Sequence, residues 1–496
     1  GEWIMNCGDI PVADYKTLAT QFNPTKFDAE SWVVLAKEAG MKYIVITTKH
    51  HDGFAMFRSE ASAYNIHDAT PFKRDPLKEL AIALPKRGIR LGAYYSILAD
   101  WGHPGGGAGQ PKWDPAQNGS LDAYLDGVAI PQLREILTRY GPIGVLWLDN
   151  DGTPRASAEQ VSRIAEAIKL QPEAIVTPRL LGYPSDFDTA EGHIPIQPPS
   201  RDWELCTKIN PNWGYTPAPA RPLKTLLEEL TEAWGKGGNV LLNVGPDAEG
   251  LIPADSAERL RGIGAWLKVN GEAVYGSTRG PFDYLPWGYT TRKSGKLYLL
   301  VQSWPADGFL RLPLALPAGK ARLLGFPEAG IKLRPPVGGI TTLELPSKPP
   351  VEVPVISLDV PGEIPRLRSL TYGARVTASE NQAKADVVIQ GGDAPAPADW
   401  RTNSSKGVLE FDLAAPATFG VIRLTTPYTS PTRLLVETGT VEGWKTLWDV
   451  TNPKGNDWTV NVPVTTASRV RLTVESAKTN VRVGLFELFP DASSHP

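Results

Sequence analysis

The chain has 496 residues, which is too long for one ordinary hydrophobic core, so two or three domains are expected. Apolar residues make up 42% of the chain and charged residues 21%, and no apolar run is long enough to span a bilayer, which predicts a soluble globular protein without membrane insertion. A formal net charge of -3 gives no electrostatic reason to expect a nucleic acid as partner.

The first half of the chain, from about Phe27 to Asn270, alternates between helix-like and strand-like segments. Asp28 is placed to cap the first helix, and Gly40 to end it. Strands are expected at Lys42–Thr48, Ile89–Ser96, Gly144–Asp149, Ala174–Thr177 and Asn239–Val244. Further helices are expected at Pro76–Arg87, Leu121–Arg139, Ala158–Leu170, Leu223–Trp234 and Ala254–Val269. This α/β pattern predicts a parallel sheet, and the lack of a glycine-rich dinucleotide turn favours a (β/α)8-like TIM barrel over residues 1–273.

The second half of the chain has short alternating strands separated by glycine and proline. Residues 274–350 are expected to form a β-sandwich. The proline-rich stretch 351–365 is interpreted as a linker. Residues 366–496 are expected to form a second all-β domain, a jelly-roll or sandwich.

Candidate chemistry lies at the carboxyl ends of the barrel strands, where such folds place their reactive groups. Asp149 follows the apolar run Val145–Leu148, so its carboxylate either faces the barrel mouth or is a structural loop carboxylate. His50 and His51 follow the first of these strands, and Tyr95 lies near the end of the next. Polar and aromatic groups gathered in this way suit a carbohydrate, which offers hydroxyls to bond and C–H faces to stack.

The adjacent histidines also raise the possibility of a metal site. Neighbouring residues on a strand point to opposite faces, so His50 and His51 reach one metal only if the strand has already ended. No HExxH or similar spacing accompanies them, and the only two cysteines, Cys7 and Cys206, are too few for a zinc ribbon. Hydrogen bonding to a sugar is therefore the favoured interpretation, and no metal is expected.

A second carboxylate is available further along the chain. Glu191 and Glu204 are both candidates. The alternative for each is a solvated surface acid, as most glutamates are. Arg179 is placed either to keep a neighbouring carboxylate ionised or to join an ordinary ion pair. Trp213 flanks this region, where it either packs in the core or offers an apolar surface.

Several motifs, in this order along the chain, resemble glycoside hydrolase family 29, the α-L-fucosidases. The resemblance rests on Lys49–Phe54, Trp147–Asp149, Trp203–Cys206, Lys236–Pro246 and Trp266–Gly276. It runs from Gly1 to about Gly276 and continues more weakly through the sandwich. It implies a retaining enzyme that hydrolyses terminal α-L-fucose through a covalent fucosyl-enzyme, with fucosylated oligosaccharides or glycoconjugates as substrates and without a cofactor.

The resemblance also implies roles for individual residues. Asp149 matches the nucleophile and Glu191 the acid/base, with Glu204 as the second choice. An apolar setting is expected to raise the pKa of Glu191. Fucose contacts are implied for Glu2, Trp3, His50, His51, Tyr95, Trp147, Arg179 and Trp213.

The tail resembles a discoidin, or F5/8 type C, module. Such modules often bind sugars, and a packing or oligomerisation role, including a homo-oligomer, is an equal alternative for this one. Enzymes with appended β-modules usually meet glycans outside the cytoplasm, which predicts a periplasmic or secreted location.

The family's first barrel strand is not found ahead of Gly1-Glu2-Trp3. The barrel is therefore expected to lack it in this chain, and the strand is either cleaved yet retained as an N-terminal fragment, or outside this sequence, or replaced by a neighbouring subunit. An inactive fucose-binding lectin on the same barrel is the alternative function. Another retaining glycosidase, such as an α-galactosidase-like barrel, is disfavoured by the motif around Gly237–Gly245.

Overall fold

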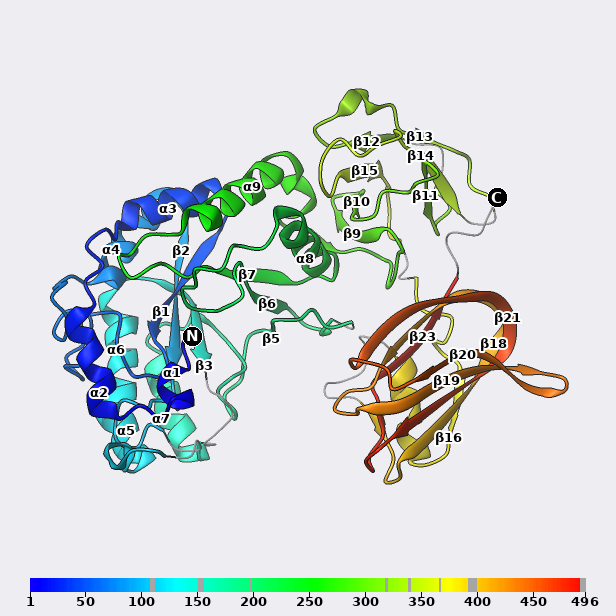
Figure 1. Ribbon diagram of the computed structural model, residues 1–496. Helices are drawn as coiled ribbons and strands as arrows, with labels where there is room; N and C mark the ends of the chain where they lie inside the picture. Colours follow the sequence, from blue (N-terminus) through cyan, green and yellow to red (C-terminus); the bar gives the residue numbers. More distant parts are fainter. Residues whose placement is uncertain are drawn as a thin grey trace. The chain divides into compact units, whose positions relative to one another are not determined.

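The computed structural model describes residues 1–107, 112–149, 156–196, 198–316, 320–337, 340–364, 367–390 and 399–490 (Figure 1). The chain divides into two compact units. The first contains Gly1–His193, Arg201–Leu230 and Asn239–Gly271, and the second contains Ile194–Ser200, Thr231–Gly238 and Glu272–Pro496. Within the described ranges, none of the helices combines the length and the apolar character that crossing a bilayer requires.

The first unit is built on two parallel sheets whose strands follow the chain order. One sheet contains β1 (Tyr43–Lys49), β2 (Arg90–Ser96), β3 (Ile143–Asp149) and β4 (Ile175–Val176). The other contains β5 (Asp188–Glu191), β6 (Trp203–Lys208) and β7 (Asn239–Asn243). The parallel arrangement is confirmed, together with the strands predicted at β1 to β4 and at β7. Two strands, β5 and β6, were not predicted, because β5 is short and mostly polar and β6 lacks the alternating or apolar pattern of a strand.

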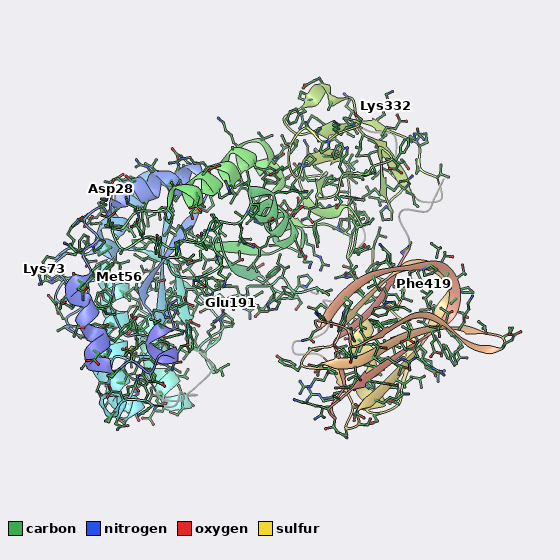
Figure 2. The ribbon with its side chains drawn as sticks, viewed as in Figure 1. Asp28, Met56, Lys73, Glu191, Lys332 and Phe419 are labelled. Atoms are coloured by element: carbon green, nitrogen blue, oxygen red, sulfur yellow. The ribbon has the colours of Figure 1, made fainter. Side chains whose placement is uncertain are left out.

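Helices cover the outer side of these strands (Figure 1). The longer ones are α3 (Ala29–Glu38), α4 (Pro76–Ala83), α6 (Ile130–Arg139), α7 (Ala158–Ile168), α8 (Leu223–Gly235) and α9 (Ala254–Asn270). The short ones are α1 (Ile4–Cys7), α2 (Val12–Thr17) and α5 (Leu121–Tyr124). The carboxylate of Asp28 accepts hydrogen bonds from the backbone N–H groups of Glu30 and Ser31, as a helix N-cap does (Figure 2). The helix predicted over Leu121–Arg139 contains a π-helical turn at Leu125–Ala129 between α5 and α6.

The strands of this unit are covered on both faces, as β3 shows. Leu146 and Leu148 belong to the large apolar cluster that the strands share with the helices. Val145 and Trp147 point the other way, into an inner cluster that also receives Cys206 from β6. Side chains from both sheets therefore meet in one interior, which is the layering of a TIM-barrel-like domain.

The second unit begins with a small antiparallel β domain. Its strands form two sheets. The first contains β8 (Thr278–Arg279), β9 (Gly288–Lys293), β10 (Lys296–Val301), β12 (Ala321–Leu323) and β15 (Val355–Asp359), and the second β11 (Phe309–Leu312), β13 (Lys332–Leu333) and β14 (Thr341–Glu344). The structure differs from the linker interpretation of 351–365, because β15 lies there and pairs with both β10 and β12. Prolines flank this strand, but its apolar core Val355–Leu358 is buried.

The part of the second unit after β15 consists mainly of β-strands, in agreement with the prediction, and it also contains a 3-10 helix at Gln382–Ile389. Its strands are β16 (Arg375–Ala378), β17 (Trp400–Arg401), β18 (Lys406–Thr425), β19 (Pro431–Thr440), β20 (Gly443–Thr451), β21 (Asp457–Ser476), β22 (Arg482–Val483) and β23 (Leu485–Phe489). The long strand β18 has an irregular register between Asp412 and Ala417. Phe411 and Phe486 stack in its core with ring centroids 4.5 Å apart.

Two glycines of α9 give a test of how tightly the first unit is packed. A Cβ added at Gly264 would lie 1.9 Å from the backbone oxygen of Glu38 in α3, whereas one at Gly262 would meet the flexible end of Leu223 at 2.8 Å. Alanine favours a helix more than glycine does, so helix propensity alone would make G264A stabilising. The added Cβ must instead force α3 and α9 apart, and we expect it to lower the free energy of unfolding by about 1–3 kcal/mol. G262A is the matched control and should unfold close to the wild-type temperature. Equal melting temperatures for the two variants would contradict this account of the α3–α9 contact.

Candidate active site

The candidate site is centred on Asp149, the last residue of β3. This carboxylate is 8% exposed. Its Oδ2 accepts a hydrogen bond of 2.5 Å from the hydroxyl of Tyr94 on β2, and its Oδ1 accepts one of 2.9 Å from Nη1 of Arg179. Nε2 of His51 lies 3.8 Å from Oδ2. A rigid strand end thus holds a carboxylate that has two donors, with an imidazole beside it.

These neighbours decide the ionisation of Asp149. Burial by itself would raise the pKa of this carboxyl, but the charge of Arg179 and the hydrogen bond from Tyr94 outweigh burial, and the pKa is lowered. Burial and the Asp149 charge raise the pKa of Tyr94 well above its ordinary value, so its hydroxyl remains a donor. Asp149 is therefore ionised and oriented at neutral pH, as a nucleophile or an electrostatic stabiliser must be.

Arg179 also joins Asp149 to a second carboxylate. While its Nη1 donates to Asp149, its Nη2 donates to Oε2 of Glu191, the last residue of β5 (Figure 2). One guanidinium therefore brings the two carboxyl groups into the same site. The Glu191 side chain is 41% exposed and ion-paired, so the apolar setting expected for it is not what the structure shows.

Glu204 has a different environment. It lies in β6, is 4% exposed, and reaches the interior of the strands. Its Oε1 accepts a hydrogen bond of 2.9 Å from Nε1 of Trp147, and its Oε2 accepts one from the hydroxyl of Tyr43. Burial raises the pKa of Glu204, while these two hydrogen bonds act in the opposite direction. Both oxygens of this carboxyl thus have protein partners.

The two histidines lie beside Asp149, and they differ in their contacts. His50 stacks on Tyr94 with ring centroids 5.5 Å apart, and its buried Nδ1 has no hydrogen-bond partner within the described part of the chain. Burial lowers the pKa of His50, which favours the neutral ring. His51 is buried, and its Nδ1 lies 2.6 Å from Oγ of Ser96. A buried ring nitrogen without a partner is a natural contact for a ligand hydroxyl.

Donor atoms of His50, His51 and Asp149 lie within 4.8 Å of one another, close enough to hold a cation. However, both oxygens of Asp149 already accept hydrogen bonds, and one of these comes from the cationic Arg179. A guanidinium in this position disfavours a second positive charge. The residues present therefore suit a metal poorly.

The structure differs from the sequence prediction at Tyr95. This side chain is fully buried on the helix side of β2, where its hydroxyl donates a hydrogen bond of 2.7 Å to Gln132 of α6. Tyr94, which was not predicted, takes its place beside Asp149. Strand alternation explains the difference, because Tyr94 pairs with the inward-facing Trp147, and Tyr95 pairs with the outward-facing Leu148. Counting residues from Asp149 back along the paired strands is the signal that would have found it.

The other predicted contacts lie near the two histidines and Trp147. Trp3 packs edge-on against His51 with ring centroids 5.3 Å apart. Arg179 lies over the ring of Trp147, 4.8 Å from its centroid. Trp213 packs against the inner cluster, and Glu2 is near enough to affect His50 electrostatically.

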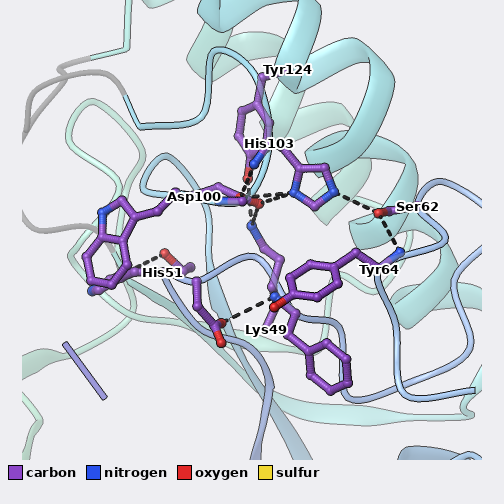
Figure 3. A network of polar contacts seen from close by, with 12 residues as sticks. Lys49, His51, Ser62, Tyr64, Asp100, His103 and Tyr124 are labelled. Atoms are coloured by element: carbon purple, nitrogen blue, oxygen red, sulfur yellow. Dashed lines mark hydrogen bonds and ion pairs between the residues drawn. The ribbon is translucent and has the colours of Figure 1, made fainter. Parts of the chain in front are cut away.

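A buried charge network fixes the segment that carries the histidines (Figure 3). Nζ of Lys49, at the end of β1, lies 2.8 Å from Oδ2 of Asp100, and Nδ1 of His103 lies 2.9 Å from Oδ1 of the same carboxylate. The backbone N–H of Trp101 donates a hydrogen bond of 2.6 Å to the carbonyl of His51. The loop after β2 is thereby attached to the end of β1.

Comparisons with known proteins agree on one family. Residues 6–272 match the family model described as alpha-L-fucosidase. The chain is 31% identical to the tissue alpha-L-fucosidase of Bos taurus over 371 residues, which cover 69% of this chain and 76% of the bovine one. Among solved structures, an alpha-L-fucosidase from Vibrio sp. strain EJY3 matches with a TM-score of 0.76 at 27% identity, covering 97% of this chain and 91% of that one. A GH29 alpha-L-fucosidase from Bacteroides thetaiotaomicron, crystallised as a trapped covalent intermediate, matches with a TM-score of 0.65 at 29% identity, covering 73% and 88%.

The electrostatic role of Arg179 can be measured directly. In R179M, burial is no longer offset by the guanidinium, so the pKa of Asp149 should rise. Carbon-13 NMR titration of labelled aspartate side chains reports this value. R163M removes an arginine on α7 that pairs with two surface aspartates, Asp122 and Asp126, and it should leave the Asp149 titration unchanged. An unshifted Asp149 titration in R179M would contradict the proposed cause.

Proposed function

Because this chain belongs to the glycoside hydrolase family 29 α-L-fucosidases, we propose that Asp149 is its nucleophile and Glu191 its acid/base in the retaining hydrolysis of terminal α-L-fucose. The single observation that carries the assignment is the guanidinium of Arg179, which binds both carboxylates at once. Retaining enzymes need their two carboxyl groups roughly 5–5.5 Å apart. Two carboxylates on one guanidinium suit that separation.

In the first step an ionised Asp149 oxygen attacks the anomeric carbon of the fucosyl unit. The bond from that carbon to the leaving oxygen breaks, and a proton from Glu191 goes to the leaving oxygen. The lowered pKa of Asp149 keeps the attacking group charged. Tyr94 and Arg179 hold its orientation, so little reorganisation is needed when the ester forms.

In the second step Glu191 acts as a base. It takes a proton from water, whose oxygen attacks the same carbon and releases Asp149, so two inversions give net retention. This task needs contact with the leaving group and then with water. The exposed side chain of Glu191 has that access.

Glu204 fits the acid/base role less well. Its raised pKa would suit an acid. However, its oxygens are occupied by Tyr43 and Trp147, and it is 4% exposed. We assign it instead to holding Trp147 beneath the sugar.

The surrounding groups suit fucose. Trp213 and Trp3 offer apolar surfaces for a sugar methyl group and C–H face, while the buried Trp147 supports the site from below Arg179. The Nδ1 atom of His50 would gain a hydroxyl as partner. The substrate is then a terminal fucosyl unit on an oligosaccharide or glycoconjugate, and Glu2 lies near enough to join the contacts.

We further propose the finer features of the molecule. The first unit is a (β/α)8-like barrel, and the tail is a discoidin-like β jelly-roll that binds glycans or supports oligomerisation. A periplasmic or secreted location fits such a module.

Azide rescue tests the nucleophile. D149A should lose several orders of magnitude in kcat/KM on an aryl α-L-fucoside, because no glycosyl ester can form. Added azide should restore turnover and give the β-fucosyl azide, since azide then attacks from the vacated face. D122A, at an exposed carboxylate paired with Arg163, should behave as the wild type. A D149A variant with near wild-type turnover would overturn the assignment.

The acid/base is separated from its competitor by the same reagent. E191A should lose about 10²–10⁴-fold with a poor leaving group and much less with an activated one. Azide should rescue it and give the α-fucosyl azide, because azide then attacks the fucosyl-enzyme. E204A is the matched control and should show a lower melting temperature without azide rescue, since it leaves Tyr43 and Trp147 unpaired. Rescue of E204A but not of E191A would reverse the two roles.

A further inference from the structure

Ser96 ends β2 and is fully buried beside the candidate site. Its Oγ makes two short contacts, one of 2.6 Å to the carbonyl oxygen of Ala99 and one of 2.6 Å to Nδ1 of His51. A serine hydroxyl carries a single proton, and a carbonyl oxygen only accepts. The hydroxyl proton therefore points to Ala99. The contact with His51 must then be a donation from the Nδ1 proton to Oγ.

This donation fixes the tautomer of His51. A neutral imidazole carries one N–H, so a proton on Nδ1 leaves Nε2 as an acceptor. Nε2 is the ring nitrogen on the side of Asp149, 3.8 Å from Oδ2. The rings of Trp3 and Trp101 pack against the imidazole with centroids 5.3 and 5.5 Å away, which resists a ring flip.

We propose that Ser96 is a positioning residue that keeps His51 in the Nδ1–H form, so that Nε2 accepts the proton of a hydroxyl on the bound fucosyl unit. The inference rests on the proposed function, since it takes fucose as the occupant of the site. A sugar hydroxyl near Asp149 has two acceptors within reach. Donation to Nε2 keeps that proton off the carboxylate, whose lone pairs are then available for attack on the anomeric carbon.

The tautomer is measured on the wild-type protein. Nitrogen-15 NMR of histidine-labelled enzyme is suitable because the chain has only 6 histidines, and H51Q identifies the signal. With saturating L-fucose, His51 should be protonated at Nδ1 and unprotonated at Nε2. Protonation at Nε2, alone or together with Nδ1, would overturn the proposal. This measurement does not depend on how any serine variant folds.

The functional consequence is tested with aryl α-L-fucosides in which each ring hydroxyl in turn is replaced by fluorine, which cannot donate. The measured quantity is the kcat/KM of the parent substrate divided by that of the fluorinated substrate. At the hydroxyl that donates to His51, this ratio should be about 10–100-fold smaller in S96A than in the wild type, because His51 can then adopt the Nε2–H form. S96T retains the hydroxyl and should restore the wild-type ratio. Comparing ratios cancels the intrinsic effect of fluorine on the reaction.

S256A is the matched control. Ser256 in α9 is equally buried, and its Oγ donates to Asn210 rather than to a histidine, with a distance of 3.1 Å. Its substrate ratios should equal those of the wild type. Unchanged ratios in S96A would overturn the proposal. If turnover of the parent substrate still depended on Asp149, the proposed function would stand and only the role of Ser96 would be wrong. Failure of the proposal and failure of the proposed function are therefore distinguishable.

Discussion

The guanidinium of Arg179 is the contact on which the site depends. It binds Asp149 at the end of β3 and Glu191 at the end of β5, so one side chain connects the carboxyl ends of strands from the two parallel sheets. The ionised carboxylate of Asp149 suits a reaction whose transition state is oxocarbenium-like and therefore gains positive charge at the sugar ring.

The three carboxyl groups of this region show how burial divides their tasks. Asp149 is buried yet ionised, because Arg179 and Tyr94 outweigh the cost of burial. Glu204 is buried with a raised pKa and has only neutral donors as partners. Glu191 has the most access to water and to a leaving group. The burial of a carboxyl alone thus does not reveal its role. The charge of its neighbours and its exposure to solvent do reveal it.

Much of the first unit could be predicted from the sequence, since long apolar strands such as β1 and β3 have an unmistakable pattern. The strand β5 could not be predicted, because Asp188–Glu191 is mostly polar and gains strand geometry only by pairing with β6. The contact of Arg179 with Glu191 could not be predicted either, because it depends on the conformation of the segment between β4 and β5. The position of Tyr94 could have been predicted, because strand alternation places it on the same face of β2 as Asp149 occupies on β3.

The two faces of the barrel strands account for both the stability and the chemistry of the site. Lys49 and Tyr95 are paired neighbours that point to the helix side, where Lys49 also bonds to Asp100. Tyr94 and Ser96 alternate with them and point to the Asp149 side. A change of one residue in register would exchange these sets and place a buried lysine where the sugar is proposed to bind. The buried ion pair of Lys49 and Asp100 opposes such a shift, since an unpaired charge on the helix side costs several kcal/mol, about 3–5 when one partner is lost.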